Sequence, residues 1–180
     1  MISDVINQEM YTRIFILMMT VFMFGVQSSN LRAFYKKLYG VASDFQNDVA
    51  LGFGLLSTVT LPLIGIFDEQ RYTNIHGFCA GVYFLSFMVY GVILGQLLYS
   101  NRDKYPAEEQ ASIQKVYFSS YGLVISIFGF GILFALFGHG GWTAILEWVV
   151  VLYQLNFFSL ISFDNPYYDT VHQPTAALKQ

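Results

Sequence analysis

Long uncharged stretches alternate with short clusters of charged residues along this chain. The uncharged runs cover residues 14–31, 49–67, 72–101 and 116–146. A helix that crosses the apolar core of a bilayer needs about 20 predominantly apolar residues. The pattern therefore predicts an integral membrane protein.

The last uncharged run is interrupted by Gly138-His139-Gly140-Gly141. Because clustered glycines end helices, we expect a fourth helix to end near Phe137 and a fifth to follow, with Glu147 near its beginning. Backbone groups in lipid must be hydrogen-bonded within their own segment, so the spans should be helical despite their Phe, Tyr and Val content. The prediction is an all-α polytopic transmembrane bundle, one membrane domain over 1–180, with spans at about 14–31, 49–67, 74–99, 116–137 and 142–163 and a C-terminal tail over 164–180.

Composition agrees with this pattern. Hydrophobic residues make up 55% of the chain and charged residues 12%, about half the usual charged share. The single cysteine, Cys79, excludes an internal disulfide framework. The residues before the first span hold Asp4 and Glu9 against one cation, Arg13, which disfavours a cleaved signal or a mitochondrial presequence.

The basic residues predict an orientation. With five spans, one side of the membrane receives most of the nine Lys and Arg residues, namely Arg32, Lys36, Lys37, Arg102, Lys104, Lys115 and Lys179. The other side receives Arg13 and Arg71. Cytoplasmic loops carry the excess of Lys and Arg, so the C-terminus should face the cytoplasm, or the matrix in a mitochondrion, and the N-terminus the opposite side.

Two ionisable residues lie in spans or at their edges: His76 opens the third span and Glu147 lies near the start of the fifth. Both helices enter from the same side, so the two side chains should lie at similar depth. A carboxylate in a span is costly and needs a polar partner, and His76 is the candidate. Gln154, Trp148 and Asp68 complete a candidate polar pocket. A structural interhelical pair, a lipid-headgroup site and acid–base catalysis are the alternatives.

Other chemistry is weakly represented. No pair of metal ligands shows the helical i, i+4 spacing, and we expect no metal and no cofactor other than a bound phospholipid. The cations are few and divided between loops, which argues against nucleic acid. In the predicted loop 31–37 the cations are mixed with aromatic residues, a composition that suits contact with anionic lipid. The cations expected to contact lipid are Arg32, Lys36, Lys37, Arg102, Lys104 and Lys115.

Helix three carries two small-xxx-small patterns, Gly77 with Gly81 and Gly91 with Gly95. Such pairs let helix backbones approach closely. We therefore expect helix three at the centre of the bundle. Cys79, in the same helix, should be a small buried apolar residue.

Two stretches, LPLIGIFDEQRYTNIHGFCAGVYFLSFMVYGVI and ILEWVVVLYQLNFFSLISFD, carry a resemblance to a family. They resemble the DRAM/Frag/Sfk family of polytopic membrane proteins, in which a helix after a short polar loop opens on His and the last span carries Glu-Trp near its start. The matching residues here are His76, Glu147 and Trp148, with Asp68 in the loop. The family usually has six spans, and this chain is expected to begin at the second.

Two functional interpretations follow. The first is a non-enzymatic accessory or scaffold subunit that packs against lipids and other integral membrane subunits of a larger complex, including a respiratory one in the mitochondrial inner membrane. The second, which the resemblance implies, is a factor of GPI-anchor lipid remodelling in the Golgi or of autophagy in lysosomal membranes. No nucleophile, metal set or phosphate loop accompanies His76 and Glu147, so we expect association rather than catalysis.

Overall fold

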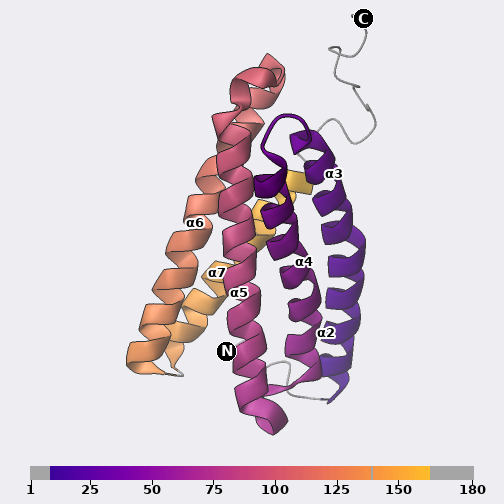
Figure 1. Ribbon diagram of the computed structural model, residues 1–180. Helices are drawn as coiled ribbons and strands as arrows, with labels where there is room; N and C mark the ends of the chain where they lie inside the picture. Colours follow the sequence, from indigo (N-terminus) through magenta and orange to yellow (C-terminus); the bar gives the residue numbers. More distant parts are fainter. Residues whose placement is uncertain (1–8, 139, 163–180) are drawn as a thin grey trace, which may run out of the picture.

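The computed structural model describes residues 9–138 and 140–162, and every regular element in these ranges is a helix (Figure 1). Five of the helical segments are long and apolar enough to cross a membrane, which confirms the predicted all-α, five-span class. The first segment is continuous over Met10–Leu38 but has three parts. The elements are α2 (Glu9–Val21), η1 (Phe22–Gln27), α3 (Ser28–Leu38), α4 (Asp44–Ile66), α5 (Glu69–Ser100), η2 (Arg102–Lys104), α6 (Ala107–Phe137) and α7 (Gly141–Ser162).

The helices extend beyond the apolar runs that predicted them. The segment 32–37, which we expected as a loop, is part of α3, and α6 begins at Ala107 rather than near 116. Leu, Arg, Ala and Lys are good helix formers, so the helix continues after it leaves lipid. Helix α3 ends at Leu38, two residues before Gly40, whose φ of 72° lies in the left-handed region that favours glycine.

Side chains and glycines fix the helix ends. The Ser43 hydroxyl accepts from the backbone N–H of Gln46 and caps α4. The Asp68 carboxylate accepts from the N–H of Arg71 at 2.9 Å and caps α5. Gly138, with φ of 61°, ends α6 where the glycine cluster predicted the break.

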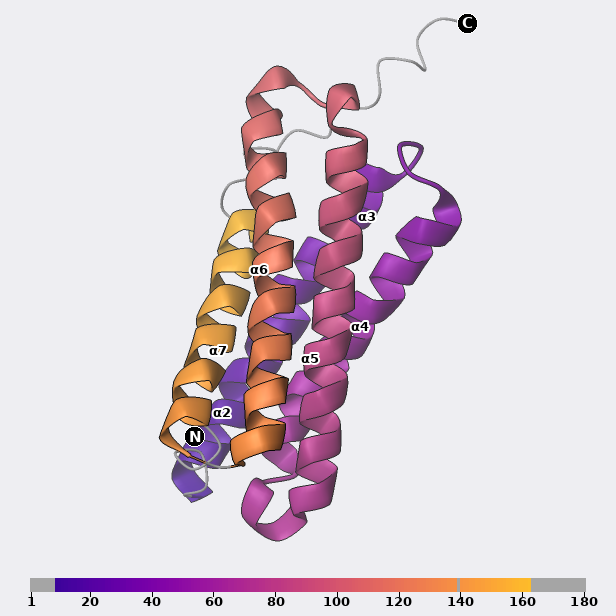
Figure 2. The same ribbon diagram turned by 90° about the vertical axis from the view of Figure 1, so that its left-hand side faces the viewer.

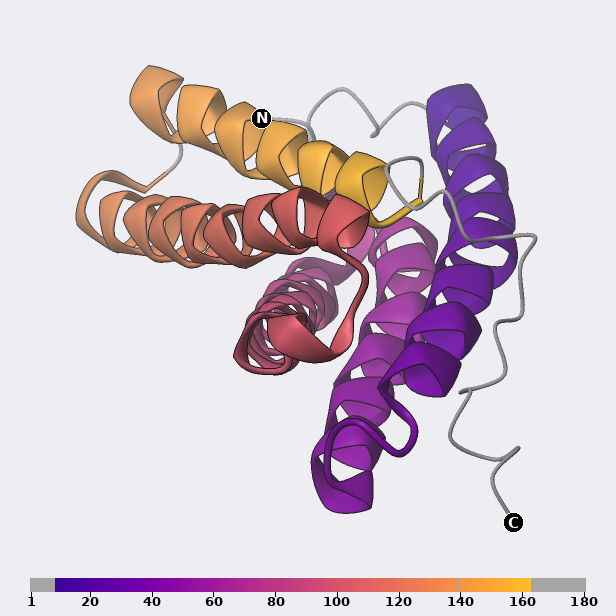
Figure 3. The same ribbon diagram turned by 90° about the horizontal axis from the view of Figure 1, so that it is seen from above.

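Helix α5 is the centre of the bundle, as predicted. It packs against α4 on one side and α6 on the other, while α6 pairs with α7 and α2 lies against α4 (Figure 3). Aromatic side chains fill the middle: the Phe87 ring of α5 lies 5.8 Å from Phe157 and 4.9 Å from Phe158 of α7. Phe158 in turn meets Phe22 of η1 at 4.9 Å. One aromatic cluster therefore joins three membrane segments.

The two glycine pairs of α5 behave differently. A Cβ on Gly95 would lie 2.8 Å from the Ser120 Oγ and 3.3 Å from the Tyr117 Cα, and a Cβ on Gly91 would lie 3.3 Å from Leu123. This pair therefore allows the close approach of α6. A Cβ on Gly77 or on Gly81 would meet open space within the described chain. Figure 1 shows α5 and α6 farther apart at the lower end of the bundle than at the upper end.

A π-helical turn interrupts the first span at η1, and no sequence pattern predicted it. Ser28 Oγ donates to the Met23 carbonyl and Ser29 Oγ to the Gly25 carbonyl, at 3.3 and 2.8 Å. At the end of this turn Gln27 is fully buried, and neither amide atom of its side chain has a hydrogen-bond partner among the described residues. Such a group lowers stability, because it gives up hydration without gaining a replacement bond.

We expect Gln27→Met to raise the free energy of unfolding by about 1–3 kcal/mol, since it keeps the side-chain volume and removes the unpaired amide. Reversible unfolding in mixed micelles would measure it. Asn47→Leu is the matched control, because the buried Asn47 amide donates to the Tyr35 carbonyl at 2.9 Å. The control should lose stability. Destabilisation by Gln27→Met would contradict the assignment of an unpaired amide.

Candidate functional site

His76 is held by the end of the preceding helix. Its Nδ1 lies 2.9 Å from the Phe67 carbonyl oxygen and 3.1 Å from that of Ile64. Carbonyl oxygens only accept, so Nδ1 carries the proton and donates to both. The last carbonyls of a helix lack intrahelical partners, and His76 supplies one across the short turn. The hydrogen bonds described for His76 thus lead to α4 and not to the expected partner, Glu147.

The other residues of the predicted polar pocket lie in separate environments. The Asp68 carboxylate caps α5 and lies 4.0 Å from the Arg71 Nε. Glu147 is half-buried on α7 and the neighbouring Trp148 is 52% exposed. Gln154, two turns further along α7, is 4% exposed and accepts a long hydrogen bond of 3.5 Å from the Tyr83 hydroxyl of α5. A polar link between α5 and α7 therefore exists, but deeper in the bundle than predicted.

At the end of the bundle opposite His76, the segments 36–43 and 101–109 contact each other through side-chain hydrogen bonds and an ion pair. We call this region, residues 36–43 and 101–109, the basic end. The Lys37 ammonium forms an ion pair with Glu109, which is 7% exposed, and lies 5.1 Å from the centre of the Tyr105 ring. The Tyr105 hydroxyl donates to the Lys37 carbonyl, and Lys104 donates to the Val41 carbonyl at 2.9 Å. Burial raises the pKa of the Tyr105 hydroxyl, and the negative charge of Glu109 raises it further.

The expected lipid-facing cations therefore divide into two groups. Lys37 and Lys104 bind protein groups at the basic end, and Arg102 stacks on the Tyr99 ring at 4.5 Å. Arg32, Lys36 and Lys115 are exposed on the helix surfaces, whereas Lys179 lies outside the described residues. Of these, Lys115 alone borders a cavity.

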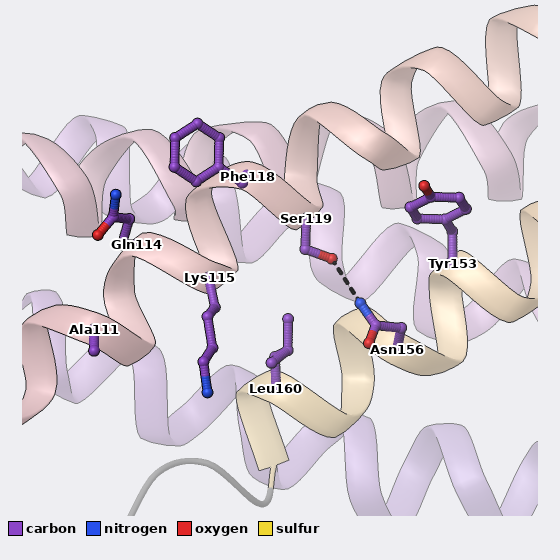
Figure 4. Close-up of a pocket in the computed structure, with 8 residues that line it drawn as sticks. All are labelled: Ala111, Gln114, Lys115, Phe118, Ser119, Tyr153, Asn156 and Leu160. Carbon is purple, nitrogen blue, oxygen red and sulfur yellow. Dashed lines mark hydrogen bonds between the residues drawn. The ribbon is translucent and has the colours of Figure 1, made fainter.

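That cavity is an open groove between α6 and α7, with a volume of about 620 Å³. The two helices run antiparallel side by side (Figure 2). The lining residues of this α6–α7 groove are Ala111, Gln114, Lys115, Phe118 and Ser119 of α6 and Tyr153, Asn156 and Leu160 of α7 (Figure 4). It opens outward, away from the face on which Ser120 and Phe157 meet α5.

Small residues and one hydrogen bond shape the groove. Asn156 Nδ2 donates to Ser119 Oγ at 3.2 Å and closes the floor between the helices (Figure 4). At the inner end the Tyr153 ring packs on Gly122, where a Cβ would lie 2.6 Å from the ring edge. Since neither Ser119 nor Gly122 fills the space between the backbones, a channel remains beside them.

The groove changes character along its length. Lys115 is the last charged residue of α6 and stands about 12 Å along the helix from its first residue, by 1.5 Å per residue. Ser119 and Asn156 follow about one turn deeper, and the walls are the apolar surfaces of Phe118 and Leu160. A cation at one end, hydrogen-bonding groups at the middle and apolar walls match an amphiphilic ligand.

The sequence identified Lys115 but missed the rest of this site. Ser119 and Asn156 read as ordinary small or polar residues of two spans, and nothing in the sequence indicates that they face one another. The available signal was Asn156 itself, an amide within the apolar run of the fifth predicted span. Among the described residues, no three His, Cys, Asp or Glu side chains gather closely enough to hold a metal ion.

Comparison with protein families identifies a match that covers most of the chain. The model described as Frag1/DRAM/Sfk1/Cwh43P N-terminal domain matches residues 1–166, which include every lining residue of the α6–α7 groove. Neither the curated proteins nor the solved structures provide a match.

The ion pair at the basic end generates a prediction. Glu109→Ala should lower the free energy of unfolding by roughly 1–3 kcal/mol, because it leaves the Lys37 ammonium partly buried without its carboxylate. The double change Lys37→Met with Glu109→Leu should recover most of this loss. The surface pair Arg102 with Asp103 is the matched control, and Asp103→Ala should change stability by less than about 0.5 kcal/mol. Equal losses for Glu109→Ala and Asp103→Ala would contradict the prediction.

Proposed function

Because the chain belongs to the Frag1/DRAM/Sfk1/Cwh43P N-terminal domain family, we propose that it is a membrane-embedded protein that binds a bilayer lipid in the α6–α7 groove and acts without catalysis. The observation that carries this proposal is the groove itself, which opens toward the bilayer and changes from cationic to apolar along its length. Residues of this kind recognise lipids at the membrane interface.

The proposed absence of catalysis is argued from the lining. Of the described residues that line the groove, none is a carboxylate, an imidazole or a thiol. These are the groups that most often act as general acids and bases, and a Ser hydroxyl such as that of Ser119 needs an adjacent base to become a nucleophile. Amide, hydroxyl and ammonium groups can hold a lipid without transforming it. His76, the candidate base that the sequence indicated, is engaged with the end of α4.

The family match favours one of the two interpretations drawn from the sequence. A factor of the DRAM/Frag/Sfk kind, in the endomembrane system, fits the match better than an accessory subunit of a respiratory complex. Within that class, the groove favours a direct lipid ligand. Partner subunits could still bind elsewhere on the bundle, and lipid in the groove would then lie beside them.

We also propose that the basic end faces the cytoplasm, since six of the eight Lys and Arg residues of the described chain lie in it or on the adjoining turns of α3 and α6. In a Cys79→Ser background, Ser43→Cys at the basic end should react with a membrane-impermeant maleimide only from the cytoplasmic side of sealed vesicles. Gln70→Cys, at the other end of the bundle, is the matched control and should react only from the opposite side. The reverse pattern would exclude this orientation.

Lipid binding is tested by filling the groove. Ala111→Trp places an indole in it, whereas Ala107→Trp, one turn earlier on the same exposed helix surface, leaves it open. Protein purified in mild detergent would be examined by native mass spectrometry. We expect wild type and Ala107→Trp to retain lipid, and Ala111→Trp to lose about 90% of it, a loss equivalent to roughly 1.4 kcal/mol. Equal retention by the two variants would refute the assignment of the site.

The catalytic alternative has its own test. Purified protein would be incubated with a GPI lipid and the products analysed by mass spectrometry. Turnover that disappears in Glu147→Gln, while folding and lipid retention persist, would replace the binding proposal with a remodelling enzyme.

A further inference from the structure

We propose that the outer face of α3 binds an anionic phospholipid whose headgroup is a phosphomonoester, held between Arg32 and Lys36. We call this pair the α3 site. Neither residue lines the α6–α7 groove, so the inference does not depend on the function proposed for the groove. Helix α3 lies at the edge of the bundle and packs against α4, which leaves its outer face open to the membrane (Figure 1).

Contacts within the protein divide the cations into two classes. Six of the eight described Lys and Arg residues interact with other groups of the chain. These six are Arg13, Lys37, Arg71, Arg102, Lys104 and Lys115. Arg32 and Lys36 are exposed, and neither side chain forms an ion pair, hydrogen bond or ring contact with another described residue. These two cations are therefore the ones left for a ligand.

Packing of α3 keeps the two cations on its outer face. The inner face of this helix is buried in the hydrophobic core and comprises Leu31, Phe34 and Leu38. Arg32 and Lys36 are four residues apart, so they lie on one face with their Cβ atoms about 5–6 Å apart. The adjacent Lys37 is turned toward the protein and pairs with Glu109. Because the core fixes the rotation of α3, Arg32 and Lys36 cannot reach such an internal partner.

The depth of the α3 site suits a lipid headgroup. Arg32 directly follows the uncharged run 14–31, which extends about 27 Å at 1.5 Å per residue, close to the roughly 30 Å of a hydrocarbon core. The helix continues to Leu38, and Lys36 stands about 6 Å farther out than Arg32. A headgroup layer is roughly 5–7 Å thick on each side of the bilayer. Both cations therefore stand in that layer.

Charge selects a phosphomonoester over a phosphodiester. Two like charges one turn apart on a helix repel each other, and a ligand with more than one negative charge relieves this repulsion best. A phosphomonoester carries more than one negative charge near neutral pH and has three terminal oxygens. The Arg32 guanidinium can bind two of these oxygens and the Lys36 ammonium the third. Phosphatidic acid is the simplest bilayer lipid with this group.

The test titrates full-length protein in mild detergent with phosphatidic acid or phosphatidylglycerol of the same acyl chains, and native mass spectrometry measures each dissociation constant. We expect phosphatidic acid to bind about fivefold more tightly, which is the roughly 1 kcal/mol of one additional charge contact at the surface. The double variant Arg32→Gln with Lys36→Gln should weaken phosphatidic acid binding about thirtyfold, or about fivefold per cation. It should also lose the preference between the two lipids.

A matched double variant controls for the general charge of this end of the bundle. Arg102→Gln with Lys104→Gln removes the same charge from cations that already contact Tyr99 and Val41. It should leave the binding of phosphatidic acid unchanged. Lys36→Arg, which keeps the charge, should also retain binding. Equal losses from the two double variants would overturn the α3 site, since the overall surface potential would then explain both.

The remaining outcomes test the ligand and the separation from the groove. Equal affinity for phosphatidylglycerol and phosphatidic acid would overturn the phosphomonoester assignment. Glycerol 3-phosphate that binds as tightly as phosphatidic acid would assign the site to a soluble phosphate instead of a lipid. Ala111→Trp fills the groove and should keep the preference for phosphatidic acid; its loss there would overturn the α3 site. Equal lipid retention by Ala111→Trp and Ala107→Trp would instead refute the groove and leave the α3 site standing.

Discussion

The constraint on which this structure depends is that a backbone in lipid must satisfy its own hydrogen bonds. Apolar solvent supplies neither donors nor acceptors, so each span becomes a helix even where Phe, Tyr and Val would favour a strand in water. The same constraint governs polar side chains within the spans. Thr58 and Ser57 donate to the Gly54 carbonyl, and Ser126 donates to the Leu123 carbonyl. These hydroxyls therefore cost little, because each finds an acceptor in its own helix.

Packing around α5 then determines where a ligand can bind. Gly91 and Gly95 admit α6 closely, and the Phe87 ring joins α7 to the same centre. Helices α6 and α7 are thereby fixed as an antiparallel pair with one face on α5 and the other free to meet lipid (Figure 2). The groove lies on the second face. Its geometry is therefore set by the core, although none of its lining residues belongs to the aromatic cluster.

Sequence patterns predicted the elements well and their side-chain partners poorly. Gaps between charged residues gave five spans, and glycine spacing placed α5 at the centre, because both depend on local composition. His76 was assigned to Glu147 since both are ionisable, but the nearest acceptors are the backbone carbonyls of Ile64 and Phe67. Every helix has such carbonyls at its end, so they leave no mark in a sequence. The π turn that ends at Gln27 was missed because a local change in the backbone hydrogen-bond pattern does not alter the apolar composition of the span.

Polar side chains on the outer face of the bundle differ from those in its interior in the partners that they bind. Interior polar groups such as Tyr83 and Gln154 meet each other across helices, and the hydroxyls of Ser57 and Thr58 bond to their own helix. Asn156 differs from both kinds. It is exposed on the outer face of α7, about one helical turn farther along the groove than Lys115. The hydrogen bond to Ser119 uses one of the two N–H donors of the Asn156 amide. The Lys115 ammonium stands about one turn nearer the basic end, on the facing helix α6. The groove therefore presents an ammonium, then an amide and a hydroxyl, then apolar walls, so its polarity follows the order of a bilayer leaflet rather than the needs of the protein core.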